Sequence, residues 1–348
     1  MTAYVRAASL GNYAEVAQRV GLDPGEMLRE AGLNPTLLSD PDLRIPIRSV
    51  VALLEESARR SACPTFGLQM AESWRMSDFG VVSLLLTHQP TLRDAIAATI
   101  HHRHLLNDSL SLWVEDAGDL VIVREELVGD GAARSRQAIE LAIGVVFRMF
   151  RALLGPHWKP RGVRFSHPAP PQLGVHRRIF GAQVDFDQAF NGIVCAAADI
   201  DRPNPTADPG MARHAQKLID AMPRNAAGGA DAAQEVRRAL RILLPLGQAT
   251  IGQVAQGMGV TARTLQRQLD ASGVTYGVLL NEARVEIVPR YLGNPAYSII
   301  QVGELLGYEF PSSFTRWFRR EFGKSPARWR AENAGGPRPA RRRSRAKA

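Results

Sequence analysis

The segment Ile299-Ile-Gln-Val-Gly-Glu-Leu-Leu-Gly307 belongs to an internal repeat in the last third of the chain, because a related segment occurs 48 residues earlier. The earlier copy reads Ile251-Gly-Gln-Val-Ala-Gln-Gly-Met-Gly259. Each copy ends in a glycine, passes through a short turn and enters a second helical segment, residues 261–269 and 311–318 respectively. A helix, a glycine turn and a second helix are typical of a helix-turn-helix motif, so the sequence predicts two such motifs.

Helical periodicity divides both second segments into a buried and an exposed face. Leu265 and Leu269 stand four residues apart, as do Phe314 and Phe318, so these side chains are predicted to face the core. The outward faces carry polar residues, namely Arg263, Gln266 and Arg267 in the first segment and Ser312, Thr315, Arg316 and Arg319 in the second. Arginine can bond guanine, glutamine can bond adenine, and hydroxyls can bond base edges or phosphates. Both segments are therefore candidate recognition helices for a DNA major groove.

The positive charge of the chain is concentrated in the same region. The 348 residues hold 43 Lys and Arg against 34 Asp and Glu, a net charge of +9. Residues 1–245 are neutral, with 27 of each kind, whereas 246–337 carry +3 and 338–348 carry +6. A helical bundle with a merely solvated polar face is the alternative interpretation. Two matched motifs in the only basic region favour a polyanion partner, DNA.

At these residues a family is recognisable, since 235–330 resemble the DNA-binding domain of AraC/XylS transcription regulators. The resemblance rests on both helix-turn-helix motifs and on a linking helix expected over 276–292, which contains Asn281-Glu-Ala-Arg284. Its most specific part is the closing run: Gly307-Tyr308, Phe314-Thr-Arg-Trp-Phe-Arg-Arg-Glu-Phe-Gly323 and Ser325-Pro326. Residues Leu43-Arg-Ile-Pro46 and Phe79-Gly80 through Thr91-Leu92 are similar to the arabinose-binding-type effector domain of one branch of the family.

The resemblance implies a bacterial transcription regulator, often an activator, that binds double-stranded promoter DNA. Base-reading roles would fall on Arg263, Gln266, Arg267, Ser312, Thr315 and Arg316. Arg319, Lys324 and the amide of Ser325 would position the DNA backbone. The other domain would sense a small-molecule effector or form a homodimer, and RNA polymerase is a further expected partner. We expect no enzymatic activity and no cofactor.

Four residues depart from the family pattern in the C-terminal region. Val288 stands in the linking helix where a small residue is usual, and Pro289 follows it. Gly303 replaces a customary alanine, and Phe310 lies in a turn that is usually polar. Because proline removes a backbone hydrogen bond, we expect the linking helix to kink or to end early near Val288.

The N-terminal part is predicted to be α+β. Residues 45–154 carry mostly helical periodicity, interrupted by a hairpin over 109–123, and further strands are expected near 162–165, 183–186 and 193–196. The predicted organisation is an effector-binding and dimerisation domain over 1–200, a connector over 201–230, an all-α DNA-binding domain with two helix-turn-helix motifs over 231–334, and a basic disordered tail over 335–348.

Weaker patterns leave alternatives open. His101 and His104 share a helical face and could hold a metal, although no shell of further ligands is evident. Cys63 and Cys195 are too few for a disulfide framework, which indicates a reducing compartment; oxidation sensing is the alternative. With no secretory signal and no apolar span for a membrane, we expect a cytoplasmic protein.

Two other classes of function stay open at this point. One is an enzyme or binding module in residues 1–200 with an accessory DNA-binding domain, which the absence of a paired catalytic motif disfavours. The other is an architectural DNA binder without sequence preference. The sequence assigns no effector-contacting residues, because many segments have the apolar character of a ligand pocket.

Overall fold

The computed structural model describes residues 3–127, 135–222, 232–247, 249–258, 260–295 and 297–333. The chain divides into two compact units, residues 1–229 and 230–348. The tail predicted over 335–348, the connector residues 223–230 and Gly259, which ends the first repeat, lie outside the described residues. The predicted bounds at 200, 230 and 334 stay predictions.

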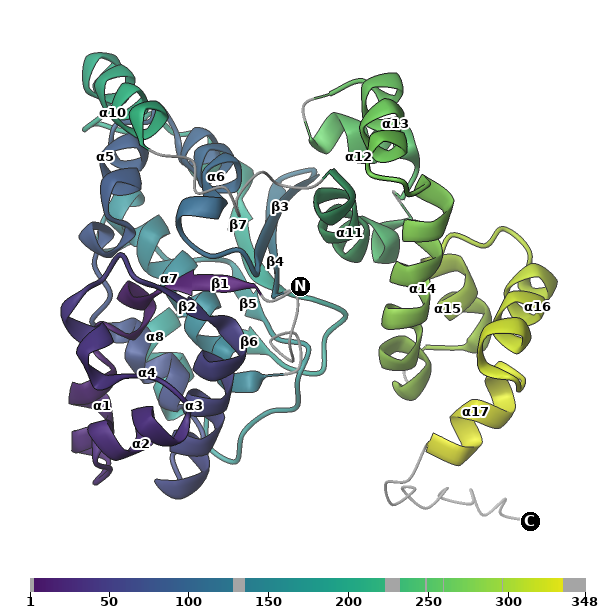
Figure 1. Ribbon diagram of the computed structural model, residues 1–348, viewed down its shortest axis with the longest axis horizontal. Helices are drawn as coiled ribbons and strands as arrows, with labels where there is room; N and C mark the ends of the chain where they lie inside the picture. Colours follow the sequence, from purple (N-terminus) through teal and green to yellow (C-terminus); the bar gives the residue numbers. More distant parts are fainter. Residues whose placement is uncertain are drawn as a thin grey trace, which may run out of the picture. The chain divides into compact units, whose positions relative to one another are not determined.

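A five-stranded sheet forms the centre of the N-terminal unit (Figure 1). Its order is β3–β4–β7–β5–β6, and neighbouring strands are antiparallel except β5 and β6. In that order the strands span Leu110–Ala117, Leu120–Leu127, Asn191–Ala196, Gly162–Arg164 and Val184–Asp185. The predicted hairpin is confirmed: Ala117 pairs with Leu120, and Gly118 takes a φ of 67° in the turn, which suits glycine. The three other predicted strands are confirmed as β5, β6 and β7.

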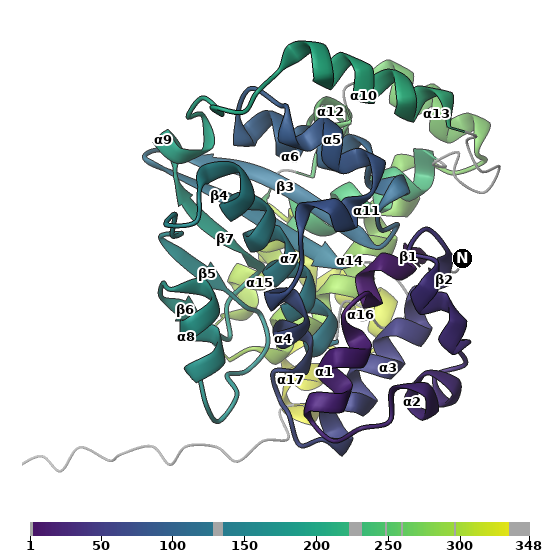
Figure 2. The ribbon, with the colours of Figure 1, turned by 90° about the vertical axis from the view of Figure 1, so that its left-hand side faces the viewer.

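The long helix α7 (Arg136–Leu154) packs against β4 and β7 and carries much of the core of this unit (Figure 2). A second helix, α4 (Phe66–Glu72), lies unusually close to it. A Cβ atom on Gly67 would stand 2.1 Å from the carbonyl oxygen of Gln137, and one on Gly144 would stand 2.5 Å from Ala71 Cβ. Glycine at both positions is therefore required for the two helices to approach this closely.

The remaining elements complete an α+β unit, as predicted. A small sheet pairs β1 (Tyr4–Arg6) with β2 (Arg44–Pro46). Thr91 caps α6 (Leu92–His101), because its side chain accepts a hydrogen bond from the amide of Asp94. The helices not yet named are α1 (Tyr13–Arg19), α2 (Pro24–Glu30), α3 (Ile47–Arg60), α5 (Val81–Thr87), α8 (Gly174–Phe180) and α9 (Ala197–Ile200).

Helix α10 (Pro209–Ala221) falls within the predicted connector and packs against α5. Asn204 anchors the segment before it, because its side-chain amide donates to the carbonyl oxygens of Thr87 and Gln89 at 2.8 and 2.9 Å. Within α10, Gln216 Oε1 lies 3.1 Å from Nε2 of the buried His102. The described residues of the connector are thus attached to the N-terminal unit.

The described part of the C-terminal unit is helical, as predicted. The first helix-turn-helix motif comprises α12 (Ile251–Gly257) and α13 (Ala262–Ala271), and the second comprises α15 (Ile299–Leu305) and α16 (Pro311–Phe322). The linking helix is α14 (Tyr276–Gly293), which packs against α15, α17 (Pro326–Asn333) and α11 (Ala232–Leu243). Both predicted motifs and the linking helix are therefore present.

The structure explains two of the four departures from the family pattern, those at Gly303 and Pro289. A Cβ on Gly303 would lie 3.2 Å from Cβ and Cγ of Phe314, so glycine makes room for the aromatic ring of the neighbouring helix. Of the two outcomes expected near Val288, the early end is wrong, because α14 continues through Pro289 to Gly293, while the kink stays a prediction. Val288, Tyr291 and Leu292 are all buried, so packing on both sides of the proline maintains the helix although one backbone hydrogen bond is lost.

Replacing Pro289 by alanine should stabilise the C-terminal unit. An interior proline costs about 3 kcal/mol relative to alanine, and alanine would restore the bond to the carbonyl of Val285. We expect the free energy of unfolding, measured by urea denaturation, to rise by up to about 3 kcal/mol. Gly277→Ala on the same helix is the control, with an expected gain of about 1 kcal/mol or less. A gain for Pro289→Ala no larger than that control would contradict the prediction.

Candidate nucleic-acid interface

The second helix of the first motif, α13, presents the polar face that its sequence predicts. Leu265 and Leu269 are fully buried, whereas Arg263, Gln266 and Arg267 are exposed. Thr261 caps the helix, because its side-chain oxygen accepts a hydrogen bond from the amide of Thr264. Within the described part of the chain, neither arginine forms an ion pair, so both guanidinium groups remain available to an anionic partner.

Helix α16 of the second motif has the same division of faces. Phe314, Trp317 and Phe318 are buried, while Ser312, Arg316 and Arg319 are exposed. The hydroxyl of Thr315 donates to the carbonyl oxygen of Pro311 at 3.0 Å, which leaves its lone pairs to accept a hydrogen bond. Arg316 and Arg319 form no ion pair among the described residues. The face opposite the core is therefore positively charged.

Lys324 and Ser325 have partners within their own unit. The ammonium group of Lys324 forms an ion pair with Glu332, which also binds Arg328. These two cations lower the pKa of Glu332. Ser325 Oγ accepts a hydrogen bond from the amide of Arg328 at 3.3 Å and so caps α17. A DNA phosphate at Lys324 would have to compete with the carboxylate of Glu332.

The linking helix holds the second motif through the residues that the family resemblance singles out. Trp317 Nε1 donates to Asn281 Oδ1 at 2.6 Å, and Arg284 Nε donates to the carbonyl oxygen of Leu306 at 2.9 Å. The guanidinium of Arg284 also lies 4.2 Å from the centre of the Tyr308 ring. Because it is partly buried, the pKa of Arg284 is lowered, although an arginine stays charged. These contacts orient α16 relative to α14.

A groove of about 660 Å³ runs between the start of α14 and α16. Its lining includes Thr275, Asn281, Arg284, Arg316 and Arg320. Arg316 thus belongs both to the exposed face of α16 and to this groove. Arg320 has no role in the pattern that sorts α16 into a base-reading and a buried face, because its position on the helix falls between the two. Spacing by four residues from Arg316 is the signal that places both on one side of α16.

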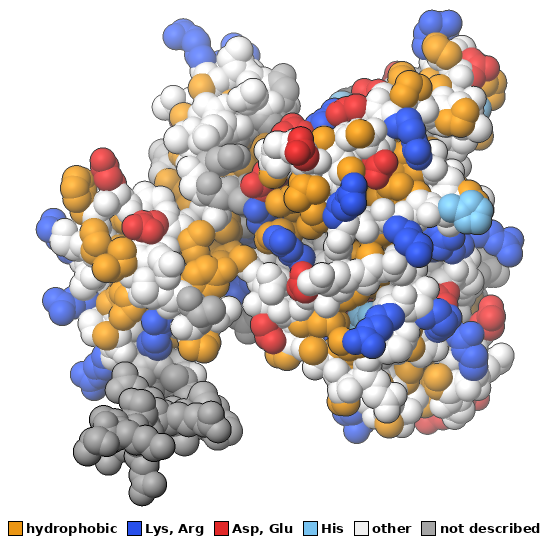
Figure 3. Space-filling model, turned by 180° about the vertical axis from the view of Figure 1, so that it is seen from behind, with side chains coloured by type: hydrophobic (Ala, Val, Ile, Leu, Met, Phe, Trp, Pro, Cys, Tyr) orange, Lys and Arg blue, Asp and Glu red, His pale blue; other side chains and the backbone are white. Residues whose placement is uncertain are grey.

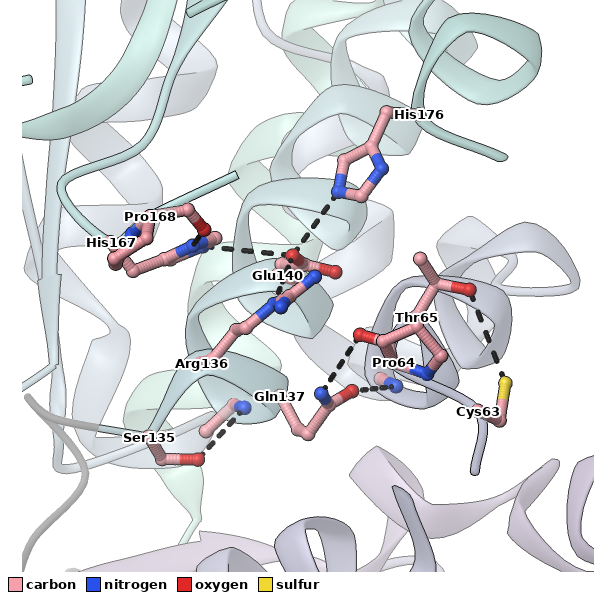
Figure 4. A network of polar contacts seen from close by, with 12 residues as sticks. Cys63, Pro64, Thr65, Ser135, Arg136, Gln137, Glu140, His167, Pro168 and His176 are labelled. Atoms are coloured by element: carbon pink, nitrogen blue, oxygen red, sulfur yellow. Dashed lines mark hydrogen bonds and ion pairs between the residues drawn. The ribbon is translucent and has the colours of Figure 1, made fainter. Parts of the chain in front are cut away.

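The N-terminal unit contains a buried polar cluster around Glu140 of α7 (Figure 4). Glu140 Oε1 accepts from Arg136 Nε at 2.9 Å and lies 3.1 Å from His176 Nε2 and 3.6 Å from His167 Nε2. Desolvation lowers the pKa of His167. The rings of Phe165 and Phe186 pack against both imidazoles. Since these residues are dispersed between Arg136 and Phe186, no local sequence motif indicated the cluster.

A second buried carboxyl group lies on the core face of the sheet. Glu125 of β4 pairs in register with Leu112 and with Asn191, and its side chain is almost completely buried. Its Oε2 atom has no hydrogen-bond partner among the described residues. Burial raises the pKa of Glu125 well above its usual value, because the charged carboxylate would lose its hydration in the core.

The metal and redox alternatives gain no support. Among the residues that the structure describes, no three His, Cys, Asp or Glu side chains are placed to hold a metal ion. Near Glu140 the guanidinium of Arg136 occupies the same carboxylate oxygen as the histidines, which disfavours a cation there. Cys63 and Cys195 are free thiols, and burial raises the pKa of Cys195 to about 12, which suppresses its reactive thiolate. Every helix in the described ranges is too short or too polar to span a lipid bilayer.

Comparison with known proteins gives matches over both units. Residues 21–204 match the family described as the arabinose-binding domain of AraC transcription regulator, N-term, and 254–332 match a helix-turn-helix domain family. The HTH-type transcriptional regulator VirS of Mycobacterium tuberculosis (strain CDC 1551 / Oshkosh) is 29% identical over 329 residues, which cover 94% of this chain and 96% of VirS.

Two further proteins are similar along most of their length. The ornithine utilization regulator of Pseudomonas aeruginosa is 23% identical over 317 residues, covering 91% of this chain and 93% of that protein. The crystal structure of the transcriptional regulator CdpR from Pseudomonas aeruginosa covers 88% of this chain and 96% of its own, with 23% identity and a TM-score of 0.43.

Replacing Glu125 by glutamine should change how stability depends on pH. The folded state binds the Glu125 proton more tightly than the unfolded state, whose pKa is the usual 4.5. The wild-type free energy of unfolding should therefore decrease as the pH rises above 4.5 toward the raised pKa of the folded state. Glutamine stays neutral, so the variant should lack this decrease and be the more stable protein at pH 7.

The measurement is urea denaturation of both proteins between pH 5 and pH 8. Glu15→Gln, at an exposed glutamate of the same unit, is the matched control and should follow the wild-type curve. If the free energy of unfolding of Glu125→Gln also changes with pH as that of the wild type does, ionisation of Glu125 does not cause the decrease in stability.

Proposed function

The chain belongs to the AraC family of transcription regulators, and on that premise we propose that it binds promoter DNA by inserting α13 and α16 into successive major-groove segments. The observation that carries the proposal is the matched pair of exposed polar faces on these two helices. Each face is opposed by buried leucine or phenylalanine side chains, namely Leu265, Leu269, Phe314 and Phe318, which fix its orientation. Base edges would be read by Arg263, Gln266, Arg267, Ser312, Thr315 and Arg316.

The linking helix supports this geometry by its length. Its 18 residues correspond to about 27 Å at a rise of 1.5 Å per residue. Equivalent major-groove positions recur about every 34 Å on B-DNA, which is of the same order. Two recognition helices on one rigid unit can thus approach one face of the duplex.

We assign the DNA backbone to a second group of cations. Arg319 is exposed beside the base-reading face, and Arg320 lines the groove between α14 and α16. Lys324 and the amide of Ser325 would bind a phosphate once Glu332 releases the lysine. Such contacts position the protein without reading sequence, and they weaken as the salt concentration rises.

The N-terminal unit would bind the effector that controls the activity of the regulator. Its membership in the arabinose-binding-type family supports a small-molecule effector, and the name of the ornithine utilization regulator supports a metabolite as the class of effector. We infer a cytoplasmic activator that contacts RNA polymerase when bound at a promoter. We assign no catalytic step to this unit, since the matched family and relatives are transcription regulators.

A homodimer through the N-terminal unit is part of the proposal. Large hydrophobic side chains remain exposed on the surface of the protein (Figure 3), and three of them belong to two helices that pack together. Leu84 lies on α5, Met211 and Leu218 follow one stripe of α10 at a spacing of seven residues, and Met222 directly follows α10. Burying this stripe against a second copy would remove apolar area from water.

The recognition surface is tested by Arg316→Ala. Losing a bidentate base contact costs about 1–3 kcal/mol, roughly a 5- to 150-fold loss of affinity. We expect this loss on a duplex that the full chain selects from a random pool, and a much smaller loss on unrelated DNA. Arg328→Ala removes the same charge from an exposed ion pair with Glu332 and is the matched control, which should affect both duplexes alike.

Deleting residues 338–348 tests the tail, whose six positive charges are expected to attract phosphates without reading sequence. The truncated chain should bind both duplexes more weakly by the same factor and show a flatter dependence on salt. If the truncation abolishes sequence preference while Arg316→Ala retains it, the recognition surface has been misassigned.

The dimer is tested by Leu218→Glu. A charge in the apolar stripe would be costly to bury, so the variant should sediment as a monomer at micromolar concentration where the wild type sediments as a dimer. Leu120→Glu, at an exposed leucine of β4, is the control and should stay dimeric. A wild-type chain that remains monomeric both alone and on the selected duplex would contradict the proposal.

A further inference from the structure

Six α-helices of the C-terminal unit, α12 to α17, have a described residue directly before them, and all but one of the six begin in the same way. Five of them start at a hydroxyl side chain that accepts a backbone amide of the first turn; the five capping residues are Thr250, Thr261, Thr275, Ser298 and Ser325. Helix α16 starts at Phe310, whose side chain makes no capping hydrogen bond. A hydroxyl or amide at this position would stabilise the helix, so the phenylalanine is a departure that local helix formation does not explain.

Phe310 is also unusual in its exposure. It is 60% exposed, the largest value among the bulky hydrophobic side chains that the structure describes, whereas Phe314 on the next turn is 1% exposed. Its ring has no stacking or cation–π contact among the described residues. Phe310 therefore contributes little to the core, and its apolar ring is available at the surface.

The internal repeat supplies a direct comparison for this position. Phe310 corresponds to Thr261 at the offset of 49 residues that relates the two second helices, just as Phe314 corresponds to Leu265 and Phe318 to Leu269. Thr261 uses its side chain to cap α13, while Phe310 leaves α16 uncapped. The two motifs thus share a fold but differ in the chemistry of the end that would enter the groove.

The N-terminal residues of a recognition helix are those that reach the base edges in the major groove. The apolar feature that a base pair presents there is the C5-methyl group of thymine, which phenylalanine can contact. Phe310 is exposed directly before the first residue of α16, and Ser312 and Arg316 are exposed within the helix, so a groove that receives this end of α16 would also receive the ring.

We propose that Phe310 is a specificity-determining residue whose ring packs on the methyl group of one thymine in the half of the binding site read by α16. The inference rests on the proposed function, because it requires α16 to lie in the major groove. It also makes the binding site chemically asymmetric. Only the α16 half depends on a methyl group at this position, since Thr261 of α13 is engaged in capping its own helix.

The test uses the full chain and removes the methyl group from the DNA as well as the ring from the protein. A binding site is first selected from a random duplex pool, and each thymine is then replaced singly by uracil, which lacks only the C5-methyl. Burying one methyl-sized group is worth about 0.8 kcal/mol, which corresponds to roughly a fourfold change in affinity. We expect the wild-type chain to lose about this factor at one thymine in the α16 half.

Two variants of Phe310 separate the ring from the fold of the helix. Phe310→Ser restores a capping hydroxyl, so its melting temperature should equal or exceed that of the wild type while its response to the uracil replacement disappears. Phe310→Leu keeps an apolar side chain and should retain part of the response. Ile300→Ser, which removes an exposed apolar side chain from α15 of the same motif, is the matched control and should respond as the wild type does.

The outcomes distinguish this inference from the function on which it rests. If the wild-type chain selects no sequence from the pool, the proposed function fails and the inference fails with it. If it selects a site but no thymine responds to uracil, or Phe310→Ser responds as strongly as the wild type, only the role of Phe310 is overturned.

Discussion

The two recognition helices must be held at one spacing and one orientation, which depends on α14 because it packs against α11 of the first half and α15 of the second, and these in turn contact α13 and α16. Its buried side chains, among them Leu279 and Ala283, place α14 in the core of the C-terminal unit. The hydrogen bond from Trp317 to Asn281 and that from Arg284 to the Leu306 carbonyl then fix α16 and the end of α15 to it. The exposed ion pairs Arg237–Glu282 and Arg241–Glu286 join α11 to the same helix but add little free energy, because water screens them.

In the N-terminal unit, the arrangement of the helices depends on the close approach of the α4 and α7 backbones. Gly67 and Gly144 let α4 lie against α7, and this leaves no room for the side chains that other residues would bring. The side chain of Gln137 then bridges to the amide of Gly67 and the carbonyl of Pro64 at 2.9 and 3.0 Å, so that buried backbone groups near the contact are satisfied (Figure 4). The core of this unit therefore tolerates polar residues where their partners are supplied by the neighbouring helix.

The C-terminal unit could be predicted from its sequence in most of its detail. The repeat at 251 and 299, the four-residue spacing of Leu265 with Leu269 and of Phe314 with Phe318, and the hydroxyl caps are all local signals. Local signals depend on backbone hydrogen bonds and side-chain periodicity within a few residues, so they can be recognised from the sequence alone. The same holds for the β3–β4 hairpin, whose strands are joined by a two-residue turn containing Gly118.

Sequence alone thus determined the class of the protein, its two helix-turn-helix motifs and the polar faces of α13 and α16. Its expectation of an early helix end at Pro289 was wrong, since buried neighbours on both sides of the proline keep α14 continuous. Only the tertiary structure decided that Glu140 meets His167 and His176, that Glu125 is a buried acid, and that Lys324 is already paired with Glu332. These side chains meet partners that are distant from them along the chain. Their burial and charge pairing therefore depend on which residues the fold brings together.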